Sequence, residues 1–422
     1  MKILVINYRY FISGGPERYM FNLHDLLSSH GHTVIPFSIH YAKNVETEYS
    51  KYFVSPLSKS DEVYFKDQTW NISSLFKTLE RSFYSQEVYR SLEKLIEEQK
   101  PDCAIVLHYL RKLSPAVLVA LSKHNIPFVV RISDFAMICP NAHMIRDGKI
   151  CELCVHGNLA NSVRYKCIQD SYSASLINYI AMHYHSLRGY FDLVPKFIVP
   201  SSFTKRKMIE AGFSSEKLVH VPTFVYPESA SSMVKKKRII YVGRVEYIKG
   251  VSVLLNAVRI LKTDHNDESF EVVIVGDGTP AYVEELKMFV RHQHLKNVQM
   301  IGNVTKEQVV ELLKESMISI APSLWYDNMP NAVLESLACG TPVIASSHGS
   351  FPDIVIDKET GFLFEPGNAN DLAQKIGQLI NNFSLCQQMG ENARQFVNLH
   401  HSPEKHYAEL MEVFSTINSE RN

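Results

Sequence analysis

Two cations in the second half of the chain have the types and spacing of an anion-binding site. Arg244 and Lys249 stand in the run YVGRVEYIKG, directly after an apolar stretch that predicts a β-strand. Arginine offers a two-pronged donor to phosphate, lysine adds a point charge, and the start of a helix contributes backbone amides. Two solvated surface cations without a ligand would have the same sequence, so this run alone does not distinguish an anion-binding site from an ordinary surface.

Two carboxylates follow in the run APSLWYDNMPNAVLESLACGTPVIAS. Asp327 lies in a loop before an expected helix that has Pro330 in its first turn, and Glu335 lies about two turns further on. These carboxylates can accept hydrogen bonds from sugar hydroxyls, and the free amides of the helix start can bind a diphosphate or a sugar. A capping aspartate and a solvated glutamate are the alternative for either residue alone.

Glycines stand where two expected strands end. Gly14 and Gly15 follow the first strand in YFISGGPER, and Gly276, Asp277 and Gly278 end the run VIVGDG. Glycine permits positive φ angles and close approach of backbone to a ligand. Ordinary turns explain each of these runs when it is taken singly.

The elements that must position these residues alternate along the whole chain. We expect strands at 2–7, 33–39, 103–107, 127–132 and 196–200, with helices between them that include 16–29, 84–99 and 115–124. In the second half the strands are RIIYVG, EVVIVG, VQMIG, ISIAPS and PVIAS, and helices are expected at roughly 250–263, 281–292, 306–315 and 330–339. This alternation predicts an α/β fold with parallel sheets, as two Rossmann-like domains that face each other across a cleft.

Composition narrows the class of protein. The 422 residues suit two or three domains, and 44 Lys and Arg balance 44 Asp and Glu, which disfavours a nucleic-acid partner. No apolar run has the length of a membrane span, and MKILVINYRY predicts a strand rather than a signal peptide. We therefore expect a cytoplasmic protein whose cysteines are thiols or metal ligands.

Taken together, the runs of the second half resemble glycosyltransferase family four, which comprises retaining enzymes of the GT-B fold. The Gly-Arg…Lys-Gly element, the Gly-Asp-Gly turn and the acidic pair before Ala-Cys-Gly-Thr-Pro-Val match in order and spacing over roughly 236–395. The GGPER loop, GHTV and IVPSSFTKRKMIEAGF extend the resemblance over nearly the whole chain. It implies transfer of a hexose-type sugar from a UDP or GDP sugar to a glycan or lipid-linked acceptor in cell-surface polysaccharide synthesis.

The resemblance also implies roles for single residues. Arg244 and Lys249 would clamp the donor diphosphate, Glu335 would bind the ribose hydroxyls, and Asp327 would hold the transferred sugar. The other residues expected around the donor are Gly14, Gly15, Gly243, Gly276, Asp277, Gly278, Asn328, Met329 and Pro330. The implied chemistry is front-face displacement in which the leaving phosphate takes the acceptor proton, so catalysis needs no metal cofactor. The sequence contains no Asp-x-Asp triplet, in agreement with a clamp made of side-chain cations.

Two positions depart from the family pattern. Asp327 stands where glutamate is usual, and its side chain is one methylene shorter. Ser133, in VVRISDF, stands where a histidine is usual. We expect Asp134 to contact the substrate, and His108 at the end of another strand is a second candidate.

Domain boundaries follow from composition and from the resemblance. We expect an acceptor-binding domain at 1–223, a polar linker at 224–238 and a donor-binding domain at 239–395. Apolar residues at helical spacing in 403–418 resemble the final helix that crosses back to the first domain.

The segment ICPNAHMIRDGKICELCVHGNLANSVRYKC contains four cysteines: Cys139, Cys151, Cys154 and Cys167. One Cys-x-x-Cys pair with two further thiols can form a structural zinc site, and four reduced thiols in a long loop are the alternative. Three others are expected to be small buried apolar side chains: Cys103, Cys339 and Cys386.

Basic residues cluster at 205–207, 235–238 and 111–112, and either touch anionic lipid headgroups or form solvated surface. A dinucleotide oxidoreductase is disfavoured, because Gly-x-Gly-x-x-Gly is missing after the first strand and the second ends in FSIHY without an acidic residue. A nucleotide-sugar epimerase or hydrolase of the GT-B fold and a catalytically silent sugar-nucleotide binder stay open.

Overall fold

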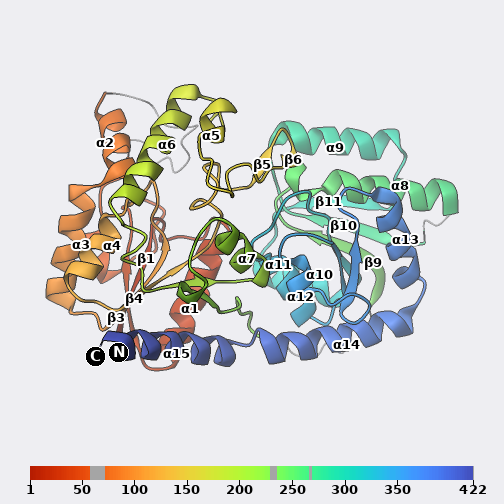
Figure 1. The fold of residues 1–422 in the computed structure, drawn as a ribbon. Helices are drawn as coiled ribbons and strands as arrows, with labels where there is room; N and C mark the ends of the chain where they lie inside the picture. Colours follow the sequence, from red (N-terminus) through yellow and green to blue (C-terminus); the bar gives the residue numbers. More distant parts are fainter. Residues whose placement is uncertain (58–71, 229–234, 266–268, 422) are drawn as a thin grey trace.

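Two parallel β-sheets form the frame of the molecule, in a computed structural model that describes residues 1–57, 72–228, 235–265 and 269–421 (Figure 1). In spatial order the first sheet contains β2 (Thr33–Phe37), β1 (Lys2–Asn7), β3 (Cys103–His108), β4 (Phe128–Arg131), β7 (Lys196–Val199) and β8 (Leu218–His220). The second contains β11 (Val298–Gly302), β10 (Glu271–Val275), β9 (Lys236–Val242), β12 (Ser316–Ala321), β13 (Val343–Ser346) and β14 (Gly361–Phe364). The expected α/β fold of two Rossmann-like units is confirmed.

Helices cover both faces of each sheet. Those of the first half are α1 (Gly15–Ser29), α2 (Ile72–Phe83), α3 (Gln86–Gln99), α4 (Ala116–Lys123), α6 (Tyr172–Leu187) and α7 (Ser202–Glu210). Those of the second half are α8 (Val251–His265), α9 (Pro280–His292), α10 (Lys306–Glu315), α11 (Asn331–Ala338), α12 (Phe351–Ile354), α13 (Ala369–Ile380) and α14 (Phe383–His400). Shorter elements are η1 (Glu48–Tyr52), β5 (Ile145–Arg146), β6 (Lys149–Ile150), α5 (Asn161–Arg164), η3 (Ser215–Lys217) and η4 (Tyr247–Lys249).

The strands are apolar on both faces because both faces are covered. Along β1 the burial is continuous from Ile3 to Asn7, and β1 pairs in parallel with β2 and β3. Parallel pairing brings the carboxyl ends of these strands to one edge of the sheet, where ligands bind in such folds.

The last helix, α15 (Pro403–Arg421), runs back along the first half of the molecule, beneath both sheets in Figure 1 with α14. Its Leu410, Val413 and Phe414 join the apolar core formed by α1, β1 and their neighbours. This packing agrees with the apolar spacing in the sequence.

One boundary differs from expectation. Residues 236–238, which we assign to the linker, form the first residues of β9. Their cationic side chains lie at the exposed strand end, where Lys236 and Arg238 pair with Glu315 at 2.7 and 2.9 Å. A basic run therefore marks this strand end, and composition alone misassigned it.

Within the part of the chain that the structure describes, no helix is both long enough and apolar enough to cross a lipid bilayer.

Candidate functional site

Lys249 and Asp327 form a short ion pair in the loops that follow β9 and β12. Lys249 Nζ lies 2.6 Å from Asp327 Oδ1, and Ser323 Oγ donates to Oδ2 at 2.6 Å. Asp327 is only 7% exposed, and Lys249 also lies 4.9 Å from the centre of the Trp325 ring. Both carboxylate oxygens are thus engaged by the protein. Because an ammonium group has three N–H donors, the bond to Asp327 leaves Lys249 able to bind an anion as well.

The predicted Gly-Asp-Gly turn packs against the loop after β9. A Cβ atom on Gly276 would lie 1.9 Å from the carbonyl oxygen of Gly243, and one on Gly278 would lie 1.8 Å from that of Val245. The carboxylate of Asp277 accepts the amide of Gly278 at 2.8 Å. Contact between two backbone segments is therefore enough to require these glycines, and their role around the donor stays a prediction.

Arg244 is not joined to the Lys249–Asp327 pair. Its guanidinium donates to Glu246 at 2.9 Å and its side chain is 57% exposed. Exposed ion pairs are held weakly in water. Arg244 can therefore exchange Glu246 for a more highly charged anion with little loss.

The loop before α11 connects the two sheets. The side-chain amide of Asn328 donates to the carbonyl of Ile132, just beyond β4, at 2.9 Å, and its oxygen accepts the hydroxyl of Thr204. Pro330 is the residue before α11, which begins at Asn331, so its expected place inside the first turn is wrong by one position. Proline's fixed φ suits either position. The expected contribution of Asn328 to sugar binding must come from its backbone.

Met329, the next residue of this loop, is partly buried against the apolar cluster around α11. Its side chain is thus used in packing. Its predicted place beside the donor rests on its backbone, like that of its neighbours.

A second ion pair crosses the cleft between α1 and α11. Arg18 Nη1 lies 2.8 Å from Glu335 Oε1, and Asn331 Nδ2 donates to the carbonyl of Gly15 at 3.2 Å. A Cβ on Gly15 would come within 3.4 Å of Asn331, so the expected close approach of the Gly14–Gly15 loop to the second half is present. Arg18 closes the GGPER run, and no pattern in the sequence marks it as part of a site.

On the first-domain side, Asp134 lies between a histidine and a backbone amide. Its carboxylate is 3.3 Å from His108 Nε2 and accepts the amide of Ala136 at 2.8 Å. Burial raises the pKa of Asp134, but hydrogen bonding to His108 and Ala136 and the charges of His108 and Arg111 lower it more, so the net pKa is lowered. The two candidates of the sequence analysis thus form one pair. Ser133 accepts a hydrogen bond from Arg131 at 3.3 Å.

A further charged group on this side escaped the sequence analysis. Glu17 is 2% exposed, accepts the hydroxyl of Ser13 at 3.2 Å and lies 3.6 Å from Arg9. Burial, followed by the charges of Arg9 and other nearby arginines, lowers the pKa of Lys112 to about 7.

His143 lies between the two sides. Its ring is 4.9 Å from that of Trp325, which follows β12. His143 is exposed, and its charged neighbours are Asp134 from the first domain and Arg244 and Lys249 from the second. No pattern in the sequence signalled this residue, because it stands alone in an irregular segment.

The cysteines are the remaining candidates from the sequence. Cys103, Cys339 and Cys386 are 4%, 5% and 1% exposed, which confirms the expectation that they are buried. Among the described residues, one set of three potential ligand side chains has all ligand atoms within 4.8 Å of one another: Glu93, Glu97 and His124. The four clustered cysteines do not meet this distance.

Three cations of the basic runs are engaged by other groups of the protein. Lys235 donates to the carbonyl of Ser316 at 2.9 Å, and Lys207 bonds both Glu152 and Glu210. Arg111 donates to the carbonyl of Pro140. These residues therefore do not form a free cationic surface.

Comparison with known proteins agrees with this geometry. Residues 226–396 match the family model Glycosyl transferases group 1. An uncharacterized glycosyltransferase of Methanocaldococcus jannaschii is 31% identical over 157 residues, which cover 37% of this chain and 42% of that protein. The amylovoran biosynthesis glycosyltransferase of Erwinia amylovora is 29% identical over 184 residues, 41% of this chain and 44% of that protein. The matches thus span less than half of these relatives.

Solved structures extend the likeness to the whole chain. The Anabaena protein HepE in complex with UDP-glucose is 16% identical, with a TM-score of 0.67, and the match covers 99% of this chain and 100% of HepE. At that identity the likeness shows the fold alone. The fold is GT-B, and the region with Lys249, Asp327 and Glu335 is the part that matches the glycosyl transferases group 1 model.

Proposed function

We propose that this protein is a retaining glycosyltransferase. It moves a hexose-type sugar from a UDP or GDP sugar to a glycan or lipid-linked acceptor in the synthesis of a cell-surface polysaccharide. The match of residues 226–396 to group 1 glycosyl transferases supports the reaction class, and the UDP-glucose held by HepE supports the kind of donor.

The observation that carries the proposal is the arrangement of Lys249. Its ammonium group is oriented by Asp327 at 2.6 Å, in a loop that faces the first domain. The carboxylate pays part of the cost of holding a cation in a partly buried place. A diphosphate that approaches this loop meets an oriented donor, so little reorganisation is needed when charge develops.

The resemblance to glycosyltransferase family four implies the course of the reaction. The bond between the sugar C1 and the leaving diphosphate breaks as the acceptor oxygen bonds C1 on the same face, and the acceptor proton passes to the leaving phosphate oxygen. Lys249 and Arg244 offset the growing negative charge on the leaving diphosphate. These two side chains thus take the place of a divalent metal ion. Asp327 positions Lys249, and Glu335 holds the nucleoside after it exchanges Arg18 for ribose hydroxyls.

The first experiment is a thermal-shift panel of UDP, GDP and ADP sugars with EDTA present. We expect a UDP or GDP sugar to stabilise the protein by RT ln(1 + [L]/Kd), which is about 2.7 kcal/mol at a hundredfold excess over Kd. Glu335→Ala and Arg244→Ala should each remove this shift. Arg259→Ala, on α8, is the control and should keep it.

The sugar that binds is then supplied with lipid-linked acceptors, and the anomeric configuration of the product is read by NMR. A product that forms only with acceptor and keeps the donor configuration supports the proposal. Hydrolysis or epimerisation without acceptor would favour the second GT-B candidate, and binding without turnover would indicate a silent binder. Strict dependence on magnesium or manganese would overturn the metal-free clamp.

Peripheral contact with an anionic membrane is a secondary part of the proposal. Since Lys207 and Lys235 are engaged within the protein, the contact would use Arg206, which is exposed on α7. Sedimentation with vesicles of anionic lipid tests it, with Arg206→Glu expected to weaken binding.

A further inference from the structure

Residues 139–170 form an irregular excursion between β4 and α6 that has little core of its own. Its regular elements are the hairpin of β5 and β6 and the single turn of α5. Its buried apolar side chains are Cys139, Met144 and Val155. Segments that bury so little apolar surface commonly depend on disulfides or a metal ion for their order.

Backbone hydrogen bonds fold this excursion so that its four cysteines approach one another. The amide of Cys151 donates to Met144 at 2.8 Å, which closes the hairpin beside the loop that contains Cys139. The side chain of Asn161 donates to Leu153 at 3.0 Å and holds α5 against the turn that contains Cys154.

Cys167 lies directly beyond α5, and its amide donates to Ser162 at 2.9 Å. Cys154 interacts electrostatically with the other three thiols, those of Cys139, Cys151 and Cys167. The four thiols therefore lie near one another, although their sulfurs are not all within 4.8 Å.

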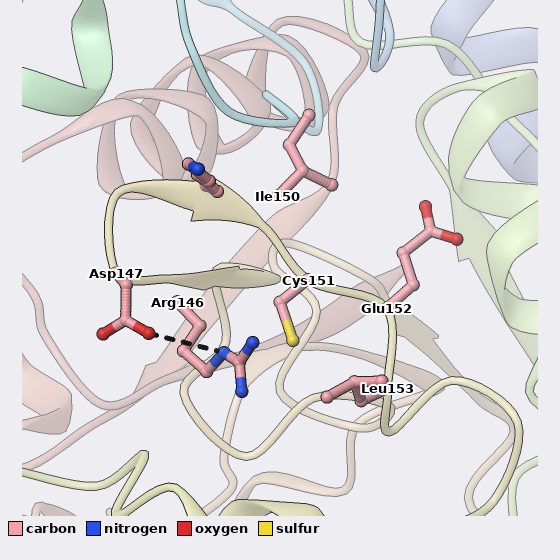
Figure 2. Close-up of a pocket in the computed structure, with 7 residues that line it drawn as sticks. Arg146, Asp147, Ile150, Cys151, Glu152 and Leu153 are labelled. Carbon is pink, nitrogen blue, oxygen red and sulfur yellow. Dashed lines mark ion pairs between the residues drawn. The ribbon is translucent and has the colours of Figure 1, made fainter.

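A guanidinium group stands beside the thiols. A cavity of about 500 Å³ is lined by residues that include Arg146, Cys151 and Leu153, and Figure 2 shows the Cys151 sulfur and Arg146 on one side of the hairpin, with Ile150 and Glu152 pointing to the other. Arg146 Nε is buried, makes no hydrogen bond among the described residues and lies 3.6 Å from Asp147. A positive charge in this place can offset the negative charge of metal-bound thiolates.

The same excursion touches the donor side of the cleft. A Cβ on Gly148, at the tip of the hairpin, would lie 3.1 Å from the ring of Tyr247, which stands between Arg244 and Lys249. The ring of His143 packs on Trp325 at 4.9 Å. The order of this excursion therefore bears directly on the loops around Lys249.

We propose that Cys139, Cys151, Cys154 and Cys167 bind one zinc ion, which holds the excursion against the donor-side loops of the second domain. Four S–H bonds lose their protons to solvent and four Zn–S bonds form, without any change of oxidation state. Tetrahedral Zn–S bonds of about 2.3 Å bring the sulfurs to about 3.8 Å from one another, so the cysteine side chains turn inward on binding. Arg146 offsets the double negative charge of the four-thiolate site.

The test uses the full chain purified under reducing conditions without chelator. Elemental analysis should find about one zinc per chain. Cys139→Ser and Cys154→Ser should each lose most of it, whereas Cys386→Ser, a buried thiol bonded to the carbonyl of Met317, should retain it. Trypsin should cut after Arg146 or Lys149 faster once the metal has been removed.

A second measurement protects the test against variants that do not fold. Wild-type protein reconstituted with Co²⁺ should show thiolate-to-metal charge-transfer absorption with the intensity expected for four thiolate ligands. A metal-free protein with four titratable thiols, or one with disulfides among these cysteines, overturns the zinc site. The donor-induced thermal shift is measured on the same samples. If zinc is lost and the shift is retained, the proposed function stands without the metal site. If zinc is bound and no donor gives a shift, the metal site stands without the proposed function.

Discussion

The two sides of the cleft hold their charged groups in different ways. On the second-domain side, Arg244 and Glu335 have partners that solvent reaches, and Lys249 keeps donors beyond its bond to Asp327. On the first-domain side, Glu17 is 2% exposed beside Arg9, and Asp134, whose side chain is 37% exposed, is held by His108 and the amide of Ala136. We predict that the second-domain groups exchange their partners for the ligand, whereas the first-domain groups keep theirs.

The strongest test of this contrast is Lys249→Ala. We expect the turnover rate to fall by about 10²–10³, equivalent to about 2.7–4 kcal/mol, because the variant loses an oriented donor where charge develops. The measurement is release of nucleoside diphosphate from the donor that gives the largest thermal shift. Lys287→Ala, an exposed lysine on α9, is the matched control, and an equal loss in both variants would contradict the assignment.

The proximity of Lys249 and Asp327 follows from the sequence because both residues lie in short runs. Lys249 and Asp327 each stand a few residues beyond an apolar strand, and adjacent parallel strands bring such ends together. Strands that are buried on both faces, such as β1 from Ile3 to Asn7, appear in the sequence as short continuous apolar runs that are easy to recognise. The same logic predicted ten of the twelve strands of the two sheets to within a few residues, and it missed the edge strands β8 and β14.

Contacts between loops of the two halves resisted prediction. His108 and Asp134 follow the adjacent parallel strands β3 and β4, so the same rule brings them together, whereas Arg18 meets Glu335 across 317 positions. His143 belongs to a segment without periodicity, so no pattern marks it. Such groups are brought together by the packing of loops, which the order of hydrophobic residues does not encode.

Low pH provides a second test, because buried neutral histidines hold the last helix against the first domain. His401 and His406 bond the carbonyls of Thr223 and Pro222 at 2.8 and 2.7 Å, and burial lowers their pKa values to about 4 and about 3. They fasten α15 to the first domain as neutral side chains. A lowered pKa in the folded state means that stability is complete above the ordinary value of about 6.5 and is lost as the pH falls towards the folded values.

We therefore expect the free energy of unfolding to fall by up to about 1.4 kcal/mol per pH unit for each histidine below pH 6.5. His406→Gln cannot titrate, so its loss between pH 7 and pH 5 should be smaller by about 2 kcal/mol. Urea unfolding at the two pH values measures this. Identical pH dependence in the variant and the parent would show that His406 is not held neutral in the fold.

The smallest effect concerns the Arg18–Glu335 pair, which joins the two sides. Arg18 is 40% exposed, so Arg18→Ala should change the free energy of unfolding by less than about 1 kcal/mol, much as Arg291→Ala does for the exposed Arg291–Glu284 pair on α9.

The two partners should nevertheless differ in donor binding. Glu335→Ala removes the thermal shift, whereas Arg18→Ala keeps or enlarges it, because the carboxylate no longer has to exchange a cation for ribose hydroxyls. A titration of the donor against both variants distinguishes them. If Arg18→Ala also removed the shift, Arg18 would be a donor ligand in its own right, and the cleft would clamp the nucleotide sugar from both sides.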